Sequence, residues 1–119
     1  MTTPFIIAVD GPAASGKGTV ATWLARELGL PVLDTGLLYR AVGVLADRAG
    51  ADPDDAEAVT AIARRLSPDQ LEDPSLRTRA AGELASRVAV HGSVRDALLA
   101  FQRSFAQQPG GAVLDGRDI

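Results

Sequence analysis

The segment with the clearest potential for chemistry is GPAASGKGT at residues 11–19, which matches the phosphate-binding pattern G-x-x-x-x-G-K. It contains Lys17, the only lysine of the chain. Glycines let successive backbone N–H groups point at one anion, and an amine on a long stem can reach the outer phosphates of a nucleotide. We therefore expect a nucleotide-binding loop formed by Gly11, Pro12, Ala13, Ala14, Ser15, Gly16, Lys17, Gly18 and Thr19.

The residues on either side of this loop are those that such a site requires. Residues 5–9 are an unbroken apolar run, which is typical of a strand buried on both faces. After the loop, Val20, Leu24 and Leu28 recur at helical spacing, with Ala21 and Ala25 beside them, until Gly29 and Pro31 end the helix. That helix would bring the positive end of its dipole under the phosphates. The structural alternative, a tight glycine turn followed by a solvated helix, is less favoured because strand, loop and helix come in this order.

Two further predicted strands also end in polar residues. Residues 31–33 lead into the loop segment 34–36 (DTG), and residues 112–114 lead into 115–118 (DGRD). In open parallel sheets, ligands gather at the carboxyl ends of the strands, so we expect the three polar segments to meet at one site. The predicted fold class is α/β with about three parallel strands.

Helical patterns fill the rest of the chain. We expect helices over residues 37–50, from a cap at Asp52 to residue 66, over residues 78–90, and from a cap at Ser93 to beyond residue 105. Residues 67–78 carry turn signals and should be irregular or contain one short helical turn. The acidic residues 52–55 suit the first turn of a helix better than a metal site. His91 is expected at the surface near a helix end, not as a catalytic base.

Composition narrows the class of protein. The 119 residues suffice for one domain, and 46% apolar with 23% charged residues is typical of a globular protein. A net charge of −3 without a Lys/Arg cluster argues against a nucleic-acid partner. The chain has no cysteine and only one histidine, which excludes a Cys- or His-based metal site. We expect no signal or membrane segment and a cytoplasmic protein.

Gly18 stands where many nucleotide-binding loops have Ser or Thr, and this Gly-Lys-Gly-Thr form resembles the nucleoside monophosphate kinases. Five separated motifs then resemble cytidylate kinases in sequence and order: IAVDGP at 7–12, LDTG at 33–36 with YR at 39–40, VRDALL at 94–99, QRSF at 102–105 and LDGRDI at 114–119. The resemblance spans nearly the whole chain. It implies the N-terminal part of a three-layer P-loop kinase domain, with a core of residues 1–50 and 92–119 and a helical nucleoside-monophosphate-binding region of residues 51–91.

The resemblance also implies a reaction, the transfer of the γ-phosphoryl group of ATP to CMP or dCMP with Mg²⁺. Lys17 and Arg117 would be catalytic, and residues 11–19 would hold the ATP phosphates. Thr19 and Asp115 would bind Mg²⁺, Asp115 through water. The acceptor nucleotide would be bound by Thr35, Arg40, Ser86, Arg95, Arg117 and Asp118.

Elementary chemistry agrees with this choice of residues. A monophosphate dianion suits forked, permanently charged donors, which Arg40, Arg95 and Arg117 can supply and lysine cannot. Arg95 taken alone is better explained as a solvent-exposed helix residue, because exposed arginines are the norm. Arg40 and Arg117 are stronger candidates, since each follows a strand-end motif.

The chain departs from the family pattern in two places. Only ten residues separate Leu66 from Arg77, where cytidylate kinases commonly carry a longer insert, so fine base selectivity stays open. The family also continues past residue 119 with two more strands and an arginine-bearing lid, and without them the first strand would be an exposed apolar edge. We therefore expect residues 1–119 to be the N-terminal half of a longer, monomeric enzyme, or a truncation, and to be inactive alone.

Two other functions remain open. One is a different P-loop small-molecule kinase, with AMP, UMP or shikimate as the acceptor. The other is a non-catalytic nucleotide-binding or partner-interaction module.

Overall fold

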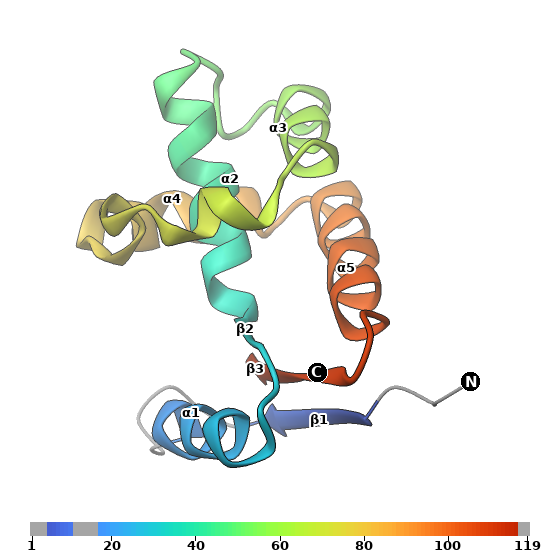
Figure 1. The fold of residues 1–119 in the computed structure, drawn as a ribbon. Coiled ribbons are helices and arrows are strands. Elements are labelled where there is room, and N and C mark those ends of the chain that lie inside the picture. Colours follow the sequence, from blue (N-terminus) through green and yellow to red (C-terminus); the bar gives the residue numbers. More distant parts are fainter. Residues whose placement is uncertain (1–4, 11–16, 117–119) are drawn as a thin grey trace. The chain divides into compact units, whose positions relative to one another are not determined.

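The computed structural model describes residues 5–10 and 17–116 (Figure 1). Internal contacts divide the chain into two units: a sheet unit, Met1–Gly36 with Gln102–Ile119, and a helical unit, Leu37–Phe101. The elements, in chain order, are β1 (Phe5–Asp10), α1 (Lys17–Leu28), β2 (Val32–Asp34), α2 (Thr35–Arg48), α3 (Ala56–Arg64), the 3₁₀ helices η2 (Pro68–Glu72) and η3 (Pro74–Arg77), α4 (Arg79–Val88), α5 (Gly92–Ala106) and β3 (Gly111–Gly116).

The sheet is parallel, as the sequence predicts, with the strand order β1-β3-β2. β3 is the central strand, and all of its residues are buried. Its register runs from Phe5↔Gly111 to Asp10↔Gly116 on one side and from Val32↔Val113 to Asp34↔Asp115 on the other. The fold is therefore the α/β class that was expected.

β1 differs from the prediction of a strand buried on both faces. It lies at the edge of the described sheet, and Ile6 is 44% exposed. Exposure alternates along the strand, because only the face that carries Ile7 and Val9 packs against α1. The expected exposed apolar edge is thus confirmed, since β2 and β3 both lie on the same side of β1.

α1 packs on the sheet through its smallest apolar residues. Ala21 and Ala25 are buried against Val113 of β3, whereas Val20 and Leu28 are exposed. Alanine lets the helix backbone approach the strands closely, so the spacing of the large residues did not identify the packed face. Figure 1 shows α1 beside β1 in the sheet unit.

α2 begins directly after β2, without the loop that the sequence suggested for residues 34–36. Thr35 is already helical, and the backbone N–H of Gly36 donates to Oδ1 of Asp34 at 2.9 Å. The Asp34 carboxylate therefore satisfies one of the backbone donors that every helix start leaves open. Asp34, at the end of β2, therefore forms a hydrogen bond at the start of α2.

Two other predicted helix starts were placed wrongly. α3 is capped by Asp55, whose side chain accepts the Ala58 N–H, while the Asp52 side chain accepts the Asp54 N–H in a preceding turn. α5 starts at Gly92, so Ser93 lies inside the helix, where its hydroxyl is 2.7 Å from that of Thr60. At α3 two aspartates satisfy the local capping rule, and only Asp55 caps the helix.

The remaining expectations for the helical unit hold in part, because the turn segment contains two 3₁₀ helices where at most one helical turn was expected, and His91 is only partly exposed. Thr78 caps α4 by accepting the Ala81 N–H at 3.1 Å, and residues 67–78 form short 3₁₀ turns. His91 is half-buried just before α5, and its Nε2 lies 2.9 Å from the Pro53 carbonyl oxygen. The largest fully buried side chains of this unit are apolar: Leu38, Val42, Val59, Leu76, Val88, Val94 and Leu98.

Candidate nucleotide-binding site

Two carboxylates lie side by side at the carboxyl edge of the sheet. Asp34 of β2 and Asp115 of β3 are register partners, and Asp115 is 6% exposed. Partners in parallel strands point to the same face, and Asp115 shares its face with Val113, which packs under α1. The pair therefore lies on the face that α1 covers.

Most of the predicted donor loop lies outside the described residues. Gly11, Pro12, Ala13, Ala14, Ser15 and Gly16 belong to that part, as do Arg117 and Asp118. Lys17 and Gly18 are the first two residues of α1, and Thr19 follows them as an exposed residue of its first turn. The helix start thus follows the loop, as a phosphate site at a helix N-terminus requires.

The carboxylate pair is compatible with Mg²⁺ bound together with a nucleotide. Among residues 5–10 and 17–116, no three His, Cys, Asp or Glu side chains group closely enough to hold a metal ion. Mg²⁺ in nucleotide sites is usually held by one or two carboxylates, with phosphate oxygens and water completing its octahedron. Asp34 and Asp115 fit that smaller requirement.

In the helical unit, Arg40 is fixed by backbone carbonyl groups. Its Nη1 donates to the carbonyl oxygens of Leu76 at 2.8 Å and Thr78 at 3.0 Å. Nη1 carries two hydrogens, so these bonds use it fully and leave Nε and Nη2 for another acceptor. Arg40 thus connects α2 to the start of α4 with one edge of its guanidinium group uncommitted by these bonds.

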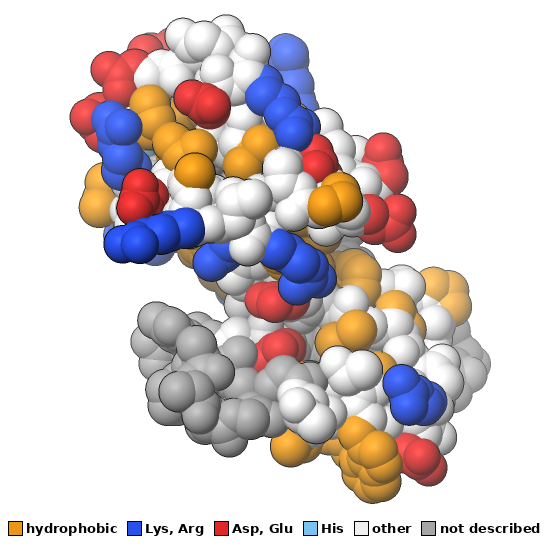
Figure 2. Space-filling model, turned by 90° about the vertical axis from the view of Figure 1, so that its left-hand side faces the viewer, with side chains coloured by type: hydrophobic (Ala, Val, Ile, Leu, Met, Phe, Trp, Pro, Cys, Tyr) orange, Lys and Arg blue, Asp and Glu red, His pale blue; other side chains and the backbone are white. Residues whose placement is uncertain are grey.

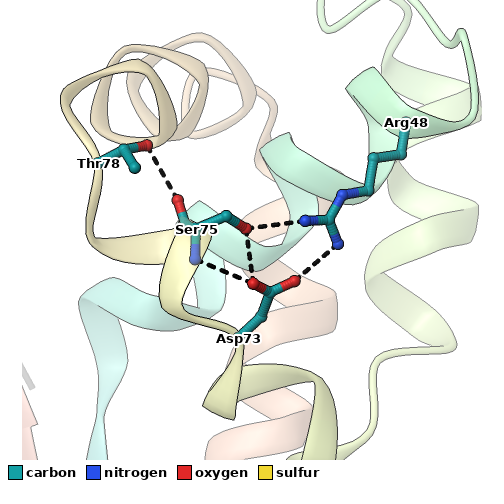
Figure 3. Close-up of polar contacts among 4 residues, drawn as sticks. All are labelled: Arg48, Asp73, Ser75 and Thr78. Carbon is teal, nitrogen blue, oxygen red and sulfur yellow. Dashed lines mark hydrogen bonds and ion pairs between the residues drawn. The ribbon is translucent and has the colours of Figure 1, made fainter.

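The segment that supplies these carbonyl groups is itself attached to α2 (Figure 3). Asp73 accepts from the N–H of Ser75 at 2.9 Å and from Arg48 Nη1 at 2.7 Å, while Arg48 Nη2 donates to the Ser75 hydroxyl at 2.9 Å. The bond from the Ser75 backbone, followed by that from Arg48, lowers the pKa of Asp73 to about 2. The Thr78 hydroxyl donates to the Ser75 carbonyl at 2.9 Å, so η3 is held at both ends.

The other predicted acceptor residues of the helical unit lie on α4 and α5. The hydroxyl of Ser86 is exposed and donates to the carbonyl oxygen of Gly82 at 3.2 Å. Arg95 is exposed, and its Nη1 donates to the Ala89 carbonyl at 2.7 Å. Burial raises the pKa of Tyr39, and the positive charge of Arg95 opposes that rise. Arg95 therefore acts electrostatically on the residue that precedes Arg40.

Gly82 joins two of these predicted residues. Its carbonyl accepts from Ser86, and the Arg40 guanidinium group lies against its Cα. Thr35, by contrast, is a buried residue of the sheet unit, at the first position of α2. The structure therefore brings Arg40 and Ser86 to one stretch of α4.

Sequence reasoning did not find Gly82 or the carbonyl groups of Leu76 and Thr78. Backbone carbonyl groups have no signature in the sequence, because every residue carries one. The single available signal was a glycine within a helical pattern, which often marks a close approach of another group.

The sheet is parallel, a G-x-x-x-x-G-K segment follows its first strand, and polar residues lie at its carboxyl edge. These features define the class of P-loop nucleotide-binding proteins, and here a P-loop kinase. The family model described as cytidylate kinase matches residues 7–119. The chain belongs to the cytidylate kinase family, as its motifs predicted.

Individual relatives agree with the family match. The chain is 64% identical over 115 residues to the cytidylate kinase of Caulobacter sp. (strain K31), covering 97% of this chain and 53% of the relative. It is 60% identical to that of Caulobacter vibrioides (strain NA1000 / CB15N) over 97% of this chain and 54% of the relative. With the cytidylate kinase of Rhodopseudomonas palustris (strain ATCC BAA-98 / CGA009), identity is 54% over 96% of this chain and 54% of the relative. The chain spans about half the length of the curated relatives it matches.

Within the part of the chain that the structure describes, no helix is both long enough and apolar enough to cross a membrane.

Proposed function

We propose that this protein catalyses the ATP-dependent phosphorylation of CMP or dCMP, giving ADP and the cytidine diphosphate. The observation that carries the proposal is the family match along residues 7–119, with relatives named cytidylate kinase at 54–64% identity. The geometry of the described residues supports it, because a phosphoryl-transfer site needs a preorganised set of charges more than a reactive side chain.

The donor nucleotide would be held by residues 11–19. In this proposal the backbone N–H groups of the loop and the N-terminus of α1 hold the ATP phosphates. Lys17 stabilises the negative charge that develops on the γ-phosphoryl group during transfer. Mg²⁺, held by Thr19 and through water by Asp115, would neutralise charge on the transferring phosphates. Asp34 adds a second negative charge beside Asp115.

The acceptor would be held mainly by arginine. Arg40 offers the Nε–Nη2 edge that its bonds to Leu76 and Thr78 leave available, which suits bidentate binding of a phosphate. We assign the remaining acceptor contacts, as the family motifs suggest, to Thr35, Ser86, Arg95, Arg117 and Asp118. Lys17 and Arg117 would act on the transferring group itself.

The test is a panel of acceptors assayed with the full-length protein encoded by this gene. With Mg²⁺ and ATP, kcat/KM should be highest for CMP and dCMP and clearly lower for UMP, AMP and shikimate. A higher value for AMP, UMP or shikimate would refute the assigned acceptor. Binding of ATP and CMP without turnover would instead indicate a nucleotide-binding module.

The proposed setting is cytoplasmic, with a monomeric full-length enzyme and neither nucleic acid nor membrane as a partner. On the face shown in Figure 2, basic and acidic side chains are interspersed over the helical part, without the single-sign surface that nucleic acid would favour. Size-exclusion chromatography with light scattering would test the monomer.

A further inference from the structure

Gly82 occupies a position where nothing in the helix itself calls for glycine. It lies inside α4, and it is not among the described glycines with positive φ. Glycine in a helix interior is unfavourable relative to alanine, because it loses more backbone freedom on folding. A reason for glycine must therefore come from a neighbouring group.

That neighbour is the guanidinium group of Arg40. A Cβ built on Gly82 would lie 3.0 Å from Nη2, 3.4 Å from Cζ and 3.7 Å from Nη1 of Arg40. The distance to Nη2 is tighter than ordinary van der Waals contact, so a side chain at residue 82 would push the guanidinium group by a few tenths of an ångström.

The guanidinium group has little freedom to yield. Its Nη1 is bonded to the carbonyl oxygens of Leu76 and Thr78. Those carbonyl groups belong to the segment that the Asp73 and Arg48 contacts hold to α2. Arg40 is thus held by fixed acceptors at Nη1, while Gly82 lies against the flat face of the guanidinium group, nearest Nη2.

A second glycine at the same pair of helices shows that this role is specific. A Cβ on Gly43 of α2 would lie 2.7 Å from Cβ and 3.0 Å from the backbone carbon of Leu84 in α4. Gly43 therefore permits close packing of helix backbones, whereas the atoms that face Gly82 belong to a functional side chain. The two glycines should respond differently to the same substitution.

We propose that Gly82 is a positioning residue for acceptor binding: the missing side chain sets where the Nε–Nη2 edge of Arg40 points. The inference rests on the proposed role of Arg40 as a ligand of the acceptor monophosphate. It predicts that a side chain at residue 82 weakens acceptor binding without weakening donor binding. It also predicts that the loss depends on the presence of Arg40.

The experiment measures KM for CMP and for ATP in the full-length protein carrying Gly82→Ala or Gly82→Val. Gly82→Ala should raise KM for CMP about three- to tenfold, since a displacement of 1 Å can cost about a hundredfold. Gly82→Val should raise it further, and KM for ATP should stay within about twofold in both variants, because the proposal assigns Arg40 to the acceptor alone. The thermal midpoint of Gly82→Ala should be unchanged or raised, because alanine favours the helix. Ala80→Val, at an exposed position of the same helix, is the matched control and should change neither KM.

A double-mutant cycle separates this inference from the proposed function. Adding Gly82→Ala to Arg40→Ala should produce no further rise in KM for CMP, because the group that is displaced has been removed. If Arg40→Ala alone leaves KM for CMP unchanged, the proposed role of Arg40 fails. If Arg40→Ala raises KM but Gly82→Ala does not, or if the Gly82→Ala effect persists in full without Arg40, the positioning role is overturned. A lowered thermal midpoint with equal rises in both KM values would likewise overturn it and assign Gly82 to packing.

Discussion

Asp34 and Asp115 are register partners on neighbouring parallel strands, near the carboxyl ends of β2 and β3. Both lie on the face of the sheet that α1 covers, and α1 begins at Lys17. Two like charges at one sheet edge favour a bound divalent cation, which Mg²⁺ bound with a nucleotide would supply. This relationship connects the strand ends to the donor side of the proposed reaction.

Asp115→Asn should therefore raise the Mg²⁺ concentration that gives half-maximal activity by about tenfold, since loss of one charged interaction is worth roughly a factor of ten. The measurement is a Mg²⁺ titration of CDP formation at fixed ATP. Asp47→Asn, on the exposed end of α2, is the matched control and should leave the titration unchanged. An unchanged titration for Asp115→Asn would remove this residue from the metal site.

Lys17→Ala should lower kcat by about a hundredfold or more while leaving CMP affinity within a few-fold, because Lys17 acts on the donor phosphates and their transferring group. Steady-state kinetics and CMP titration calorimetry on the full-length protein measure the two effects. Arg26→Ala removes an exposed cation from the last turn of the same helix and should leave both values near those of the wild type. Retained turnover in Lys17→Ala would contradict the assigned role.

Arg40→Ala should raise KM for CMP about ten- to hundredfold with little change in KM for ATP, since charged hydrogen bonds to the acceptor are lost. Arg40→Lys should recover little of the loss, because lysine cannot reproduce the fork that holds two carbonyl groups and a phosphate together. The control is Arg79→Ala, which removes a side chain that is 95% exposed and only weakly paired with Glu83 at 3.6 Å. A rise in KM for ATP equal to that for CMP would show general damage instead of a lost acceptor contact.

Asp73→Asn should lower the thermal midpoint by a few degrees at neutral pH, because it removes the acceptor of Arg48 while keeping an oxygen for the Ser75 N–H. The pKa of Asp73 is lowered from 3.8 to about 2, so its ionised form stabilises the folded state above the unfolded value. That contribution is lost as pH falls from 3.8 to about 2, and the difference between the two proteins should shrink over this interval. Thermal melts across the interval measure it.

The control for that experiment is Glu72→Gln, an exposed carboxylate in the neighbouring η2. Its difference from the wild type should be small at every pH, as for most solvent-exposed charges. A difference for Asp73→Asn that stays constant down to pH 2 would mean that the Arg48 contact does not depend on the ionised carboxylate.

The sequence predicted the parallel sheet and its order of elements because the apolar runs and the glycine loop are local signals. It did not predict the exposure of β1 correctly from the same run. An apolar strand shows which faces can be buried, but which elements cover them depends on the rest of the chain. The edge position of β1 followed instead from the family resemblance, because in the family's sheet the other two strands lie on the same side of the first.

The helix caps and the groups that bind Arg40 show a second limit of prediction from the sequence. Asp52 and Asp55 both satisfy the local rule for a cap, and only the turn formed by Asp52 decides between them. The carbonyl groups of Leu76 and Thr78 that hold Arg40 come from a 3₁₀ segment far along the chain. Such contacts depend on tertiary structure, so sequence motifs could name the arginine but not the groups that orient it.

The most direct test of the proposed function is to separate the products after the full-length protein is incubated with ATP, CMP and Mg²⁺. We expect ADP and CDP in equal amounts, with both lost in Lys17→Ala. ADP formed without CDP, or no CDP at any CMP concentration, would contradict the proposed function.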